Sequence, residues 1–178
     1  RTDDDVTELV STSRHGNNVM HFPPPAITEI FPNLEILYLN HAFMSQLTRN
    51  SFRNCARLRR LRVSNNNLAV FPAGVVNHCT NLEYIGFESN NMRIVEAGAF
   101  AGLTRILHID MFVNQIQVIQ ANLFASQVNM HTLSLVTNQI SVIQPGAFAS
   151  LASIQLLNLG VNNLTVLSNE VFGEEHLQ

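Results

Sequence analysis

Apolar residues recur every 24 residues along most of this chain, and this repetition constrains the fold more than any other feature. In each repeat, apolar residues occupy the first, fourth, sixth, eleventh, fourteenth and nineteenth positions. The first positions of the six repeats are Leu34, Leu58, Leu82, Ile106, Met130 and Ile154. A sequence with this period is expected to form stacked turns, because a single turn cannot bury its own apolar face.

The third to seventh positions of each repeat predict a short strand with one buried face. The fourth and sixth positions are apolar and alternate with variable residues, which is the period of a half-buried strand. Equivalent strands from successive turns are expected to stack as a parallel sheet. The nineteenth position is Phe in every repeat except the second, where it is Val76, and it is predicted to fill the core.

The ninth position of five repeats is Asn, and Ala42 takes its place in the first repeat. An Asn amide can satisfy backbone groups that a buried turn would leave without partners. We therefore predict a structural column that starts one turn late. Its members, called the Asn column below, are Asn66, Asn90, Asn114, Asn138 and Asn162.

This pattern resembles the leucine-rich-repeat family, in its typical 24-residue extracellular type, from Leu34 to the end of the chain. The segments NLEILYLN and PGAFASL are most similar to insect immune leucine-rich-repeat proteins and Toll-type receptor ectodomains. The resemblance implies an α/β leucine-rich-repeat solenoid, a horseshoe with a parallel concave β-sheet and short 3-10 or irregular convex segments. It also implies protein recognition as the usual role.

The repeats divide the chain into two parts. Residues 1–33 are expected to form a degenerate N-terminal capping turn, without the Cys-rich cap that secreted members of the family often carry. Its aligned residues are Asn17, Val19, Phe22 and Pro23. Residues 34–178 form six repeats, and no polar capping segment follows them. We therefore expect an uncapped C-terminal edge, either because the chain is a fragment of a longer protein or because this edge pairs with another molecule.

Composition argues against several classes of function. The net charge is −3 with 13% charged residues, so the chain as a whole lacks the basic excess of a nucleic-acid binder. All ten basic residues are Arg, which excludes chemistry that depends on Lys. The His residues lack the spacing of a zinc site, no run of apolar residues is long enough to span a membrane, and no cofactor is expected.

His108, Asp110 and Ser134 are predicted to share one surface, which raises the possibility of a hydrolase. The predicted surface is open and the sequence has no nucleophile elbow, so we expect no enzymatic activity.

Cys55 and Cys79 occupy the same position of consecutive repeats, a position filled by Leu103 and Leu151 in two later repeats. Stacking could bring them within disulfide range, but two buried thiols that replace Leu are the favoured hypothesis. The only glycosylation triplet begins at Asn163 and fits a secreted glycoprotein.

The variable strand positions are expected to be exposed and to form a partner-binding surface. Arg and aromatic residues cluster there, and both are enriched at interface hot spots. Phe112, Val113, Val136 and Val161 extend the cluster as an apolar patch. The predicted partner-binding residues are Tyr38, Arg60, Arg62, Tyr84, Glu88, His108, Asp110, Phe112 and Val136.

The sequence thus predicts an extracellular recognition module, secreted or part of a membrane-protein ectodomain, that binds a protein ligand or co-receptor through its concave face. Innate immunity or receptor signalling is the expected context. Two alternatives remain open. One is a scaffold that assembles into homo- or hetero-oligomers through the C-terminal edge. The other is a binder of anionic glycan or nucleic acid, since six of the ten Arg lie between Arg49 and Arg62.

Overall fold

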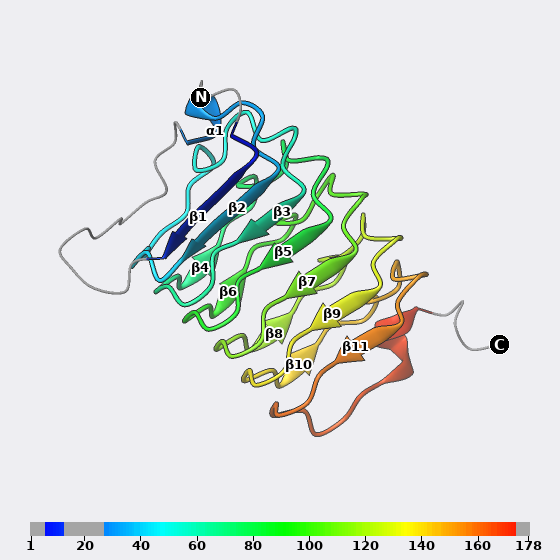
Figure 1. Cartoon of the computed structure of the whole chain (residues 1–178). Helices are drawn as coiled ribbons and strands as arrows, with labels where there is room; N and C mark the ends of the chain where they lie inside the picture. Colours follow the sequence, from blue (N-terminus) through cyan, green and yellow to red (C-terminus); the bar gives the residue numbers. More distant parts are fainter. Residues whose placement is uncertain (1–5, 13–26, 174–178) are drawn as a thin grey trace.

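The computed structural model describes residues 6–12 and 27–173, and these residues form a solenoid of stacked turns (Figure 1). Seven strands make one parallel sheet in the order β1-β2-β3-β5-β7-β9-β11. Six of them are the strands predicted from the repeats. The seven strands are β1 (Glu8–Thr12), β2 (Ile36–Asn40), β3 (Arg60–Arg62), β5 (Tyr84–Gly86), β7 (His108–Asp110), β9 (Thr132–Ser134) and β11 (Leu156–Asn158).

The sheet register follows the sequence repeat. Arg60 pairs with Tyr84 and Tyr84 pairs with His108, so each strand is aligned with its neighbour at equivalent positions of the repeat. Before the first repeat, β1 adds a strand to the sheet, with Glu8 paired to Ile36. A short helix, α1 (Ile27–Ile30), precedes β2. The residues from Asn17 to Pro23 that align with a degenerate turn lie outside the described part of the chain.

The side of the solenoid away from the sheet consists mostly of turns, as the resemblance implied. Two pairs of short strands lie behind the main sheet in Figure 1. In one pair, β4 (Val70–Phe71) is hydrogen-bonded to β6 (Ile94–Val95), and in the other, β8 (Val118–Ile119) is hydrogen-bonded to β10 (Val142–Ile143). One 3-10 helix, η2 (Asn169–Phe172), follows β11.

The core is a continuous stack of apolar columns between these two sides. Phe100 packs against Phe124 with ring centroids 5.6 Å apart, and Phe124 packs against Phe148 at 6.2 Å. Where Val76 interrupts this Phe column, Phe71 contacts Phe100 at 5.3 Å and continues the aromatic packing. Stability therefore comes from contacts between neighbouring turns, as expected for a solenoid.

The Asn column has the predicted structural role. Its side chains donate to backbone carbonyls of their own and the preceding turn and accept backbone N–H groups from the preceding turn. Asn66 Oδ1 accepts from the N–H groups of Ala42 and Met44, both at 3.0 Å, so the column begins one turn after the first repeat. Each member thus satisfies buried backbone groups where the chain leaves the sheet.

Cys55 and Cys79 form a disulfide bond, and the hypothesis of two free thiols is wrong. Stacking in register places their Cα atoms 4.8 Å apart, inside the range that a disulfide requires. The bond lies in the core and joins the turns that contain β2 and β3.

Candidate functional site

The candidate site is the outward surface of the seven-stranded sheet. We call the surface made by the third, fifth and seventh positions of the repeats, from β2 to β11, the open face. The sheet lies in front of β4, β6, β8 and β10 in Figure 1, so the open face is turned toward the viewer. The fourth and sixth positions of each repeat point into the core, and backbone pairing holds the intervening side chains at fixed spacing.

The third positions form a row of adjacent side chains across the sheet. Arg60, Tyr84, His108 and Thr132 stand side by side in register on four strands. Arg60 is exposed and the other three are half-buried. The guanidinium of Arg60 has no hydrogen-bond or ion-pair partner among the described residues. It is therefore available to pair with a carboxylate from outside the chain.

Glu88, predicted as a partner-binding residue, is only 2% exposed and is not available at the surface. Arg62 lies over it and donates from Nε to Glu88 Oε1, and Nη2 forms an ion pair with the same oxygen. Arg62 Nε also donates to Ser64 Oγ at 3.2 Å. Glu88 Oε2 is buried and has no partner among the described residues. Arg62 keeps a partly exposed edge, but its charge is neutralised inside the protein.

The absence of a side chain at Gly86 explains why the open face is enclosed around Tyr84 and Glu88. Tyr84 and Glu88 lean over Gly86 from both sides, and a Cβ atom at Gly86 would lie 2.8 Å from Tyr84 Oη and 2.8 Å from Glu88 Oε2. Tyr84 thereby reaches Asp110 and donates to its Oδ2 at 2.9 Å. Burial of the ring, followed by the nearby Asp110 carboxylate, raises the pKa of Tyr84, so this phenol stays protonated as a donor.

The expectation that every variable strand position is exposed is therefore wrong at Ser64, Gly86 and Glu88, all of which are buried. Alternation along a strand predicts direction but cannot show that a neighbouring side chain folds over a residue. The remaining predicted residues lie on the open face. They are Tyr38, Arg60, Arg62, Tyr84, His108, Asp110, Phe112 and Val136.

The structure places His108, Asp110 and Ser134 on neighbouring strands but does not join them in a catalytic relay. Asp110 is opposite Ser134 in the register, and its carboxylate accepts the Tyr84 hydroxyl. The ring of His108 packs edge-on against His131, with centroids 6.2 Å apart. Within the described residues, no hydrogen bond connects His108 to either partner, so the geometry supplies no base for a serine nucleophile.

The rim of the open face is formed by the eighth positions of the repeats, and its backbone conformation does not follow from the repeat pattern. All six eighth positions have φ between 54° and 56° and so lie in the left-handed region. They are His41, Asn65, Ser89, Val113, Thr137 and Val161. This conformation is costly for β-branched side chains, so the last three turns carry backbone strain at this rim.

The Arg cluster predicted from the sequence is divided among different surfaces. Arg60 and Arg62 lie on the open face, whereas Arg49 packs beside Gly74 in a turn away from the sheet. Arg59 precedes β3 and forms an ion pair with Glu83 at 2.8 Å. Since two of these Arg are neutralised by carboxylates of the chain, the cluster does not form one continuous basic surface.

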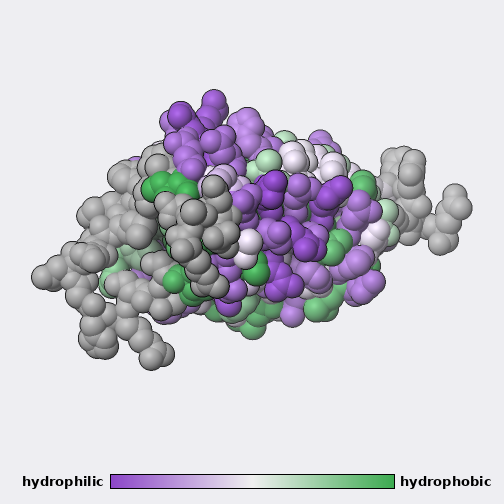
Figure 2. All heavy atoms as spheres, turned by 45° about the horizontal axis from the view of Figure 1, so that its top comes forward, coloured by the Kyte–Doolittle hydropathy of each residue, from purple (hydrophilic) through white to green (hydrophobic). Residues whose placement is uncertain are grey.

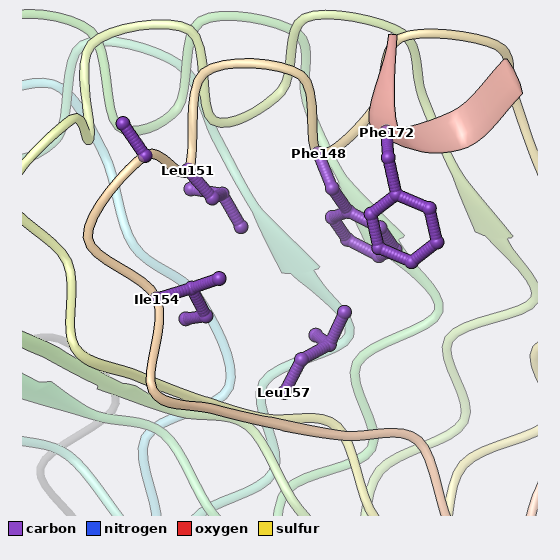
Figure 3. Close-up of a pocket in the computed structure, with 6 residues that line it drawn as sticks. Phe148, Leu151, Ile154, Leu157 and Phe172 are labelled. Atoms are coloured by element: carbon purple, nitrogen blue, oxygen red, sulfur yellow. The ribbon is translucent and has the colours of Figure 1, made fainter. Parts of the chain in front are cut away.

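An apolar pocket of about 280 Å³ lies outside the open face, at the last described turns (Figure 3). In Figure 2 the top of the molecule as seen in Figure 1 is turned toward the reader. Hydrophilic residues dominate the centre of this face, and hydrophobic ones appear as separate spots and along its lower edge. The pocket is lined by Phe148, Leu151, Ala152, Ile154, Leu157 and Phe172.

The described ranges contain no group of three or more His, Cys, Asp or Glu side chains arranged to hold a metal ion. None of their helices has the length and apolar character needed to cross a membrane.

Comparison with known proteins gives a family match and several structural relatives. A family model described as "BspA type Leucine rich repeat region" matches 6 copies over residues 45–178. No curated protein sequence matches the chain. The solved structure of a leucine-rich-repeat protein of Leptospira interrogans has a TM-score of 0.77 at 22% identity, covering 95% of this chain and 41% of that one.

Two structures of complexes also match. A chain of the LRIM1/APL1C complex has a TM-score of 0.75 at 20% identity, covering 82% of this chain and 27% of that one. The Toll–Spatzle complex is described as a molecular hub in Drosophila development and innate immunity. A chain of this complex has a TM-score of 0.68 at 18% identity, covering 86% of this chain and 24% of that one. At these identities the likeness shows the fold, and this chain spans 24% to 41% of the three structures.

Proposed function

The chain belongs to the BspA-type leucine-rich-repeat family, and on this premise we propose that it is an extracellular recognition module that binds a protein partner through its open face. The observation that carries this proposal is the row formed by Arg60, Tyr84, His108 and Thr132. Four turns place exposed or half-buried side chains side by side at fixed spacing. The residues between them already fill the core, so the row is available for binding.

Rigid presentation is the proposed mechanism of binding. The parallel ladder, the Asn column and the stacked core fix the backbone beneath the open face before any partner arrives. Docking then costs little ordering entropy, which favours affinity. Arg60 offers a charge that no described residue of the chain neutralises. Phe112 and Val136 offer apolar contact two and three turns away, and such a mixture of Arg and aromatic anchors suits a protein surface.

The extracellular location is supported by covalent chemistry. The Cys55–Cys79 disulfide is typical of proteins that fold in an oxidising compartment. Asn163 and Thr165 of the glycosylation triplet are exposed, which fits the same compartment. LRIM1/APL1C and Toll–Spatzle are complexes between proteins, and an immune or receptor context is proposed for this chain by analogy with them.

The same proposal holds that the chain acts by binding and not by catalysis. Among the described residues, the open face offers no Ser or Thr hydroxyl in contact with a His or a carboxylate, and its one buried carboxylate is paired with Arg62. Recognition needs only the exposed side chains and their rigid spacing.

The test uses a partner captured from extracellular fluid by the intact chain and identified by mass spectrometry. Binding is then measured with purified proteins for Arg60→Ala, Tyr84→Phe and Phe112→Ala, with Arg53→Ala as the matched control away from the sheet. Arg60→Ala and Phe112→Ala should each weaken binding about tenfold, with unchanged thermal unfolding, as is usual for interface anchors. If Arg53→Ala weakens binding and the open-face variants do not, the proposed surface is wrong.

A further inference from the structure

We infer that Tyr84 closes a recess over Gly86 on the open face, and that this recess receives a lysine ammonium group of the partner. The inference deepens the proposed function and rests on it, because it names the chemical group with which the partner anchors itself. The acceptors are the carboxylates of Asp110 and Glu88. Three observations support it: the missing side chain at Gly86, a buried carboxylate oxygen without a partner, and the negative charge beside them.

Gly86 leaves a gap in a row of side chains across the sheet. It pairs in register with Arg62 on one neighbouring strand and with Asp110 on the other. The tips of Tyr84 and Glu88 occupy the gap, since Tyr84 Oη and Glu88 Oε2 each lie 2.8 Å from the point that a Cβ atom of Gly86 would take. Both are the ends of side chains with rotatable bonds. Tyr84 can therefore turn outward and open a recess whose floor is the backbone.

The recess contains an acceptor that the chain leaves unused. Glu88 is 2% exposed and its Oε1 is taken by Arg62, whereas its Oε2 is buried without a partner among the described residues. A buried carboxylate oxygen without a donor is costly, so a group that supplies a donor stabilises the structure when it binds. Since Oε2 lies beside the missing Cβ of Gly86, the donor enters over Gly86.

The charge around the recess favours a cation. Arg62 and Glu88 neutralise each other, whereas the carboxylate of Asp110 accepts from a neutral donor, the Tyr84 hydroxyl, at 2.9 Å. An ammonium group can replace this hydroxyl on Asp110 and give a second hydrogen bond to Glu88 Oε2. The exchange favours the ammonium, because hydrogen bonds from charged donors to carboxylates are about twice as strong as neutral ones.

Lysine fits this recess better than arginine does. Its ammonium is a compact group with three donors on a long flexible stem, whereas a guanidinium is a planar fork that needs a wider opening. The 178 residues of the chain include no Lys, because all ten basic residues are Arg. The ammonium group therefore comes from outside these residues.

Arg60 adds a second requirement for the partner. Arg60 lies on β3 and Asp110 on β7, and β5 lies between them, so the two positions are about 10 Å apart across the sheet. Arg60 is exposed and available to a carboxylate. The partner is therefore expected to present a Lys and an acidic residue about 10 Å apart. Tyr84, turned outward, packs against the partner between them.

Titration with n-butylammonium, which has the stem and the ammonium group of lysine, tests the recess without the partner. The chain has two Tyr and no Trp, so its emission comes from Tyr38 and Tyr84. A phenol that is hydrogen-bonded to a carboxylate emits weakly, so release of the Tyr84 hydroxyl from Asp110 should give a saturable rise in emission. Tetramethylammonium, with the same charge and no N–H donor, is the matched control at equal ionic strength and should give no such rise.

Substitutions assign the response to the recess. Tyr84→Phe removes the reporter and should abolish the rise. Asp110→Asn removes the charge with little change of shape and should weaken butylammonium binding about tenfold, whereas Glu35→Gln removes an exposed charge outside the open face and should have no effect. Gly86→Ala fills the floor and should reduce the rise. Thermal unfolding checks that each variant is folded. Equal responses to the two cations, or wild-type binding by Asp110→Asn, would overturn the inference.

The captured partner tests whether the recess acts in recognition. Acetylation of the partner's Lys residues before mixing removes their charge and should weaken binding about tenfold or more. Dimethylation keeps the charge and one N–H donor, so it is the matched control and should leave most of the affinity. The same acetylation of this chain should not weaken binding, because it has no Lys side chain.

The two experiments separate failure of this inference from failure of the proposed function. Binding that survives acetylation of the partner but is weakened by Arg60→Ala and Phe112→Ala would overturn the inference and leave the proposed function intact. A partner whose binding is unaffected by every open-face variant would contradict both.

Discussion

The side-chain amide of Asn114 donates to the carbonyl oxygen of Phe87, 27 residues earlier in the chain, at 3.0 Å. It also donates to Met111 at 3.1 Å, and Asn114 Oδ1 accepts from the N–H of Met92 at 3.0 Å. Asn114 is only 7% exposed, so water cannot replace these bonds. One side chain therefore satisfies backbone groups in two turns.

We predict that Asn114→Ala destabilises the domain by about 3 kcal/mol, because it leaves several buried backbone groups without partners. Urea unfolding followed by circular dichroism measures this loss. Gln117→Ala is the control, since Gln117 is exposed and three residues away, and it should change stability by less than about 0.5 kcal/mol. Equal effects of the two substitutions would mean that the Asn column has no structural role.

The Cys55–Cys79 disulfide joins residues 24 apart in the sequence. Closing a loop of this length in the unfolded chain stabilises the fold by about 3 kcal/mol. The double variant Cys55→Ala and Cys79→Ala should lose stability by about this amount in urea unfolding. A reducing agent should lower the urea midpoint of the wild-type chain toward that of the double variant, and should leave the double variant unchanged. A midpoint for the wild-type chain that does not respond to reduction would contradict the assignment.

Strain at the rim predicts a substitution that stabilises the protein. Val113 has a φ of 54° and is 44% exposed, so burial of its side chain compensates little for the cost of this backbone conformation. Asn adopts this region readily, and Val113→Asn should raise stability by about 1 kcal/mol. Val128 is 45% exposed and is not among the residues with positive φ, so Val128→Asn should give no increase. The thermal unfolding midpoints of Val113→Asn and Val128→Asn, each compared with that of the wild-type chain, test this prediction.

The pairing of Arg62 with Glu88 predicts unequal roles for two neighbouring Arg residues. Arg62→Ala would leave a buried carboxylate without its partner and should cost about 2 kcal/mol, less than for a fully buried pair because Arg62 is partly exposed. Arg59→Ala removes a solvent-exposed pair with Glu83 and should change stability little. Denaturant unfolding of both variants checks this difference. A larger loss in Arg59→Ala would contradict the account of the buried pair.

Much of the fold follows from the repeat period, because burial of the same positions in every turn leaves few arrangements of the chain. Leu61 and Ile85 are fully buried for this reason, and the strands, their register and the Asn column agree with the sequence prediction. The strand β1 was not expected as part of the sheet, because the repeat pattern does not extend to Glu8.

The misjudged parts of the site depend on contacts that a repeat does not encode. Glu88 stands at a position that alternation directs outward, yet Gly86 leaves space for Glu88 and Tyr84 to fold inward, and Arg62 covers the carboxylate. The disulfide depends on the distance between neighbouring turns. The 24-residue spacing of the two Cys makes the bond possible but does not fix that distance. The strain at Val113 is a property of the backbone and could not be read from an exposed Val.

The most direct test of the central claim is a footprint of the bound partner on the chain. Hydroxyl-radical oxidation of side chains, read by mass spectrometry with and without partner, measures which of them lose access to solvent. We predict protection of Tyr84, His108 and Phe112 on the open face, with Phe43 and Val128 oxidised equally in both states. Protection confined to Val128 and other residues away from the sheet, with the open face unchanged, would contradict the claim.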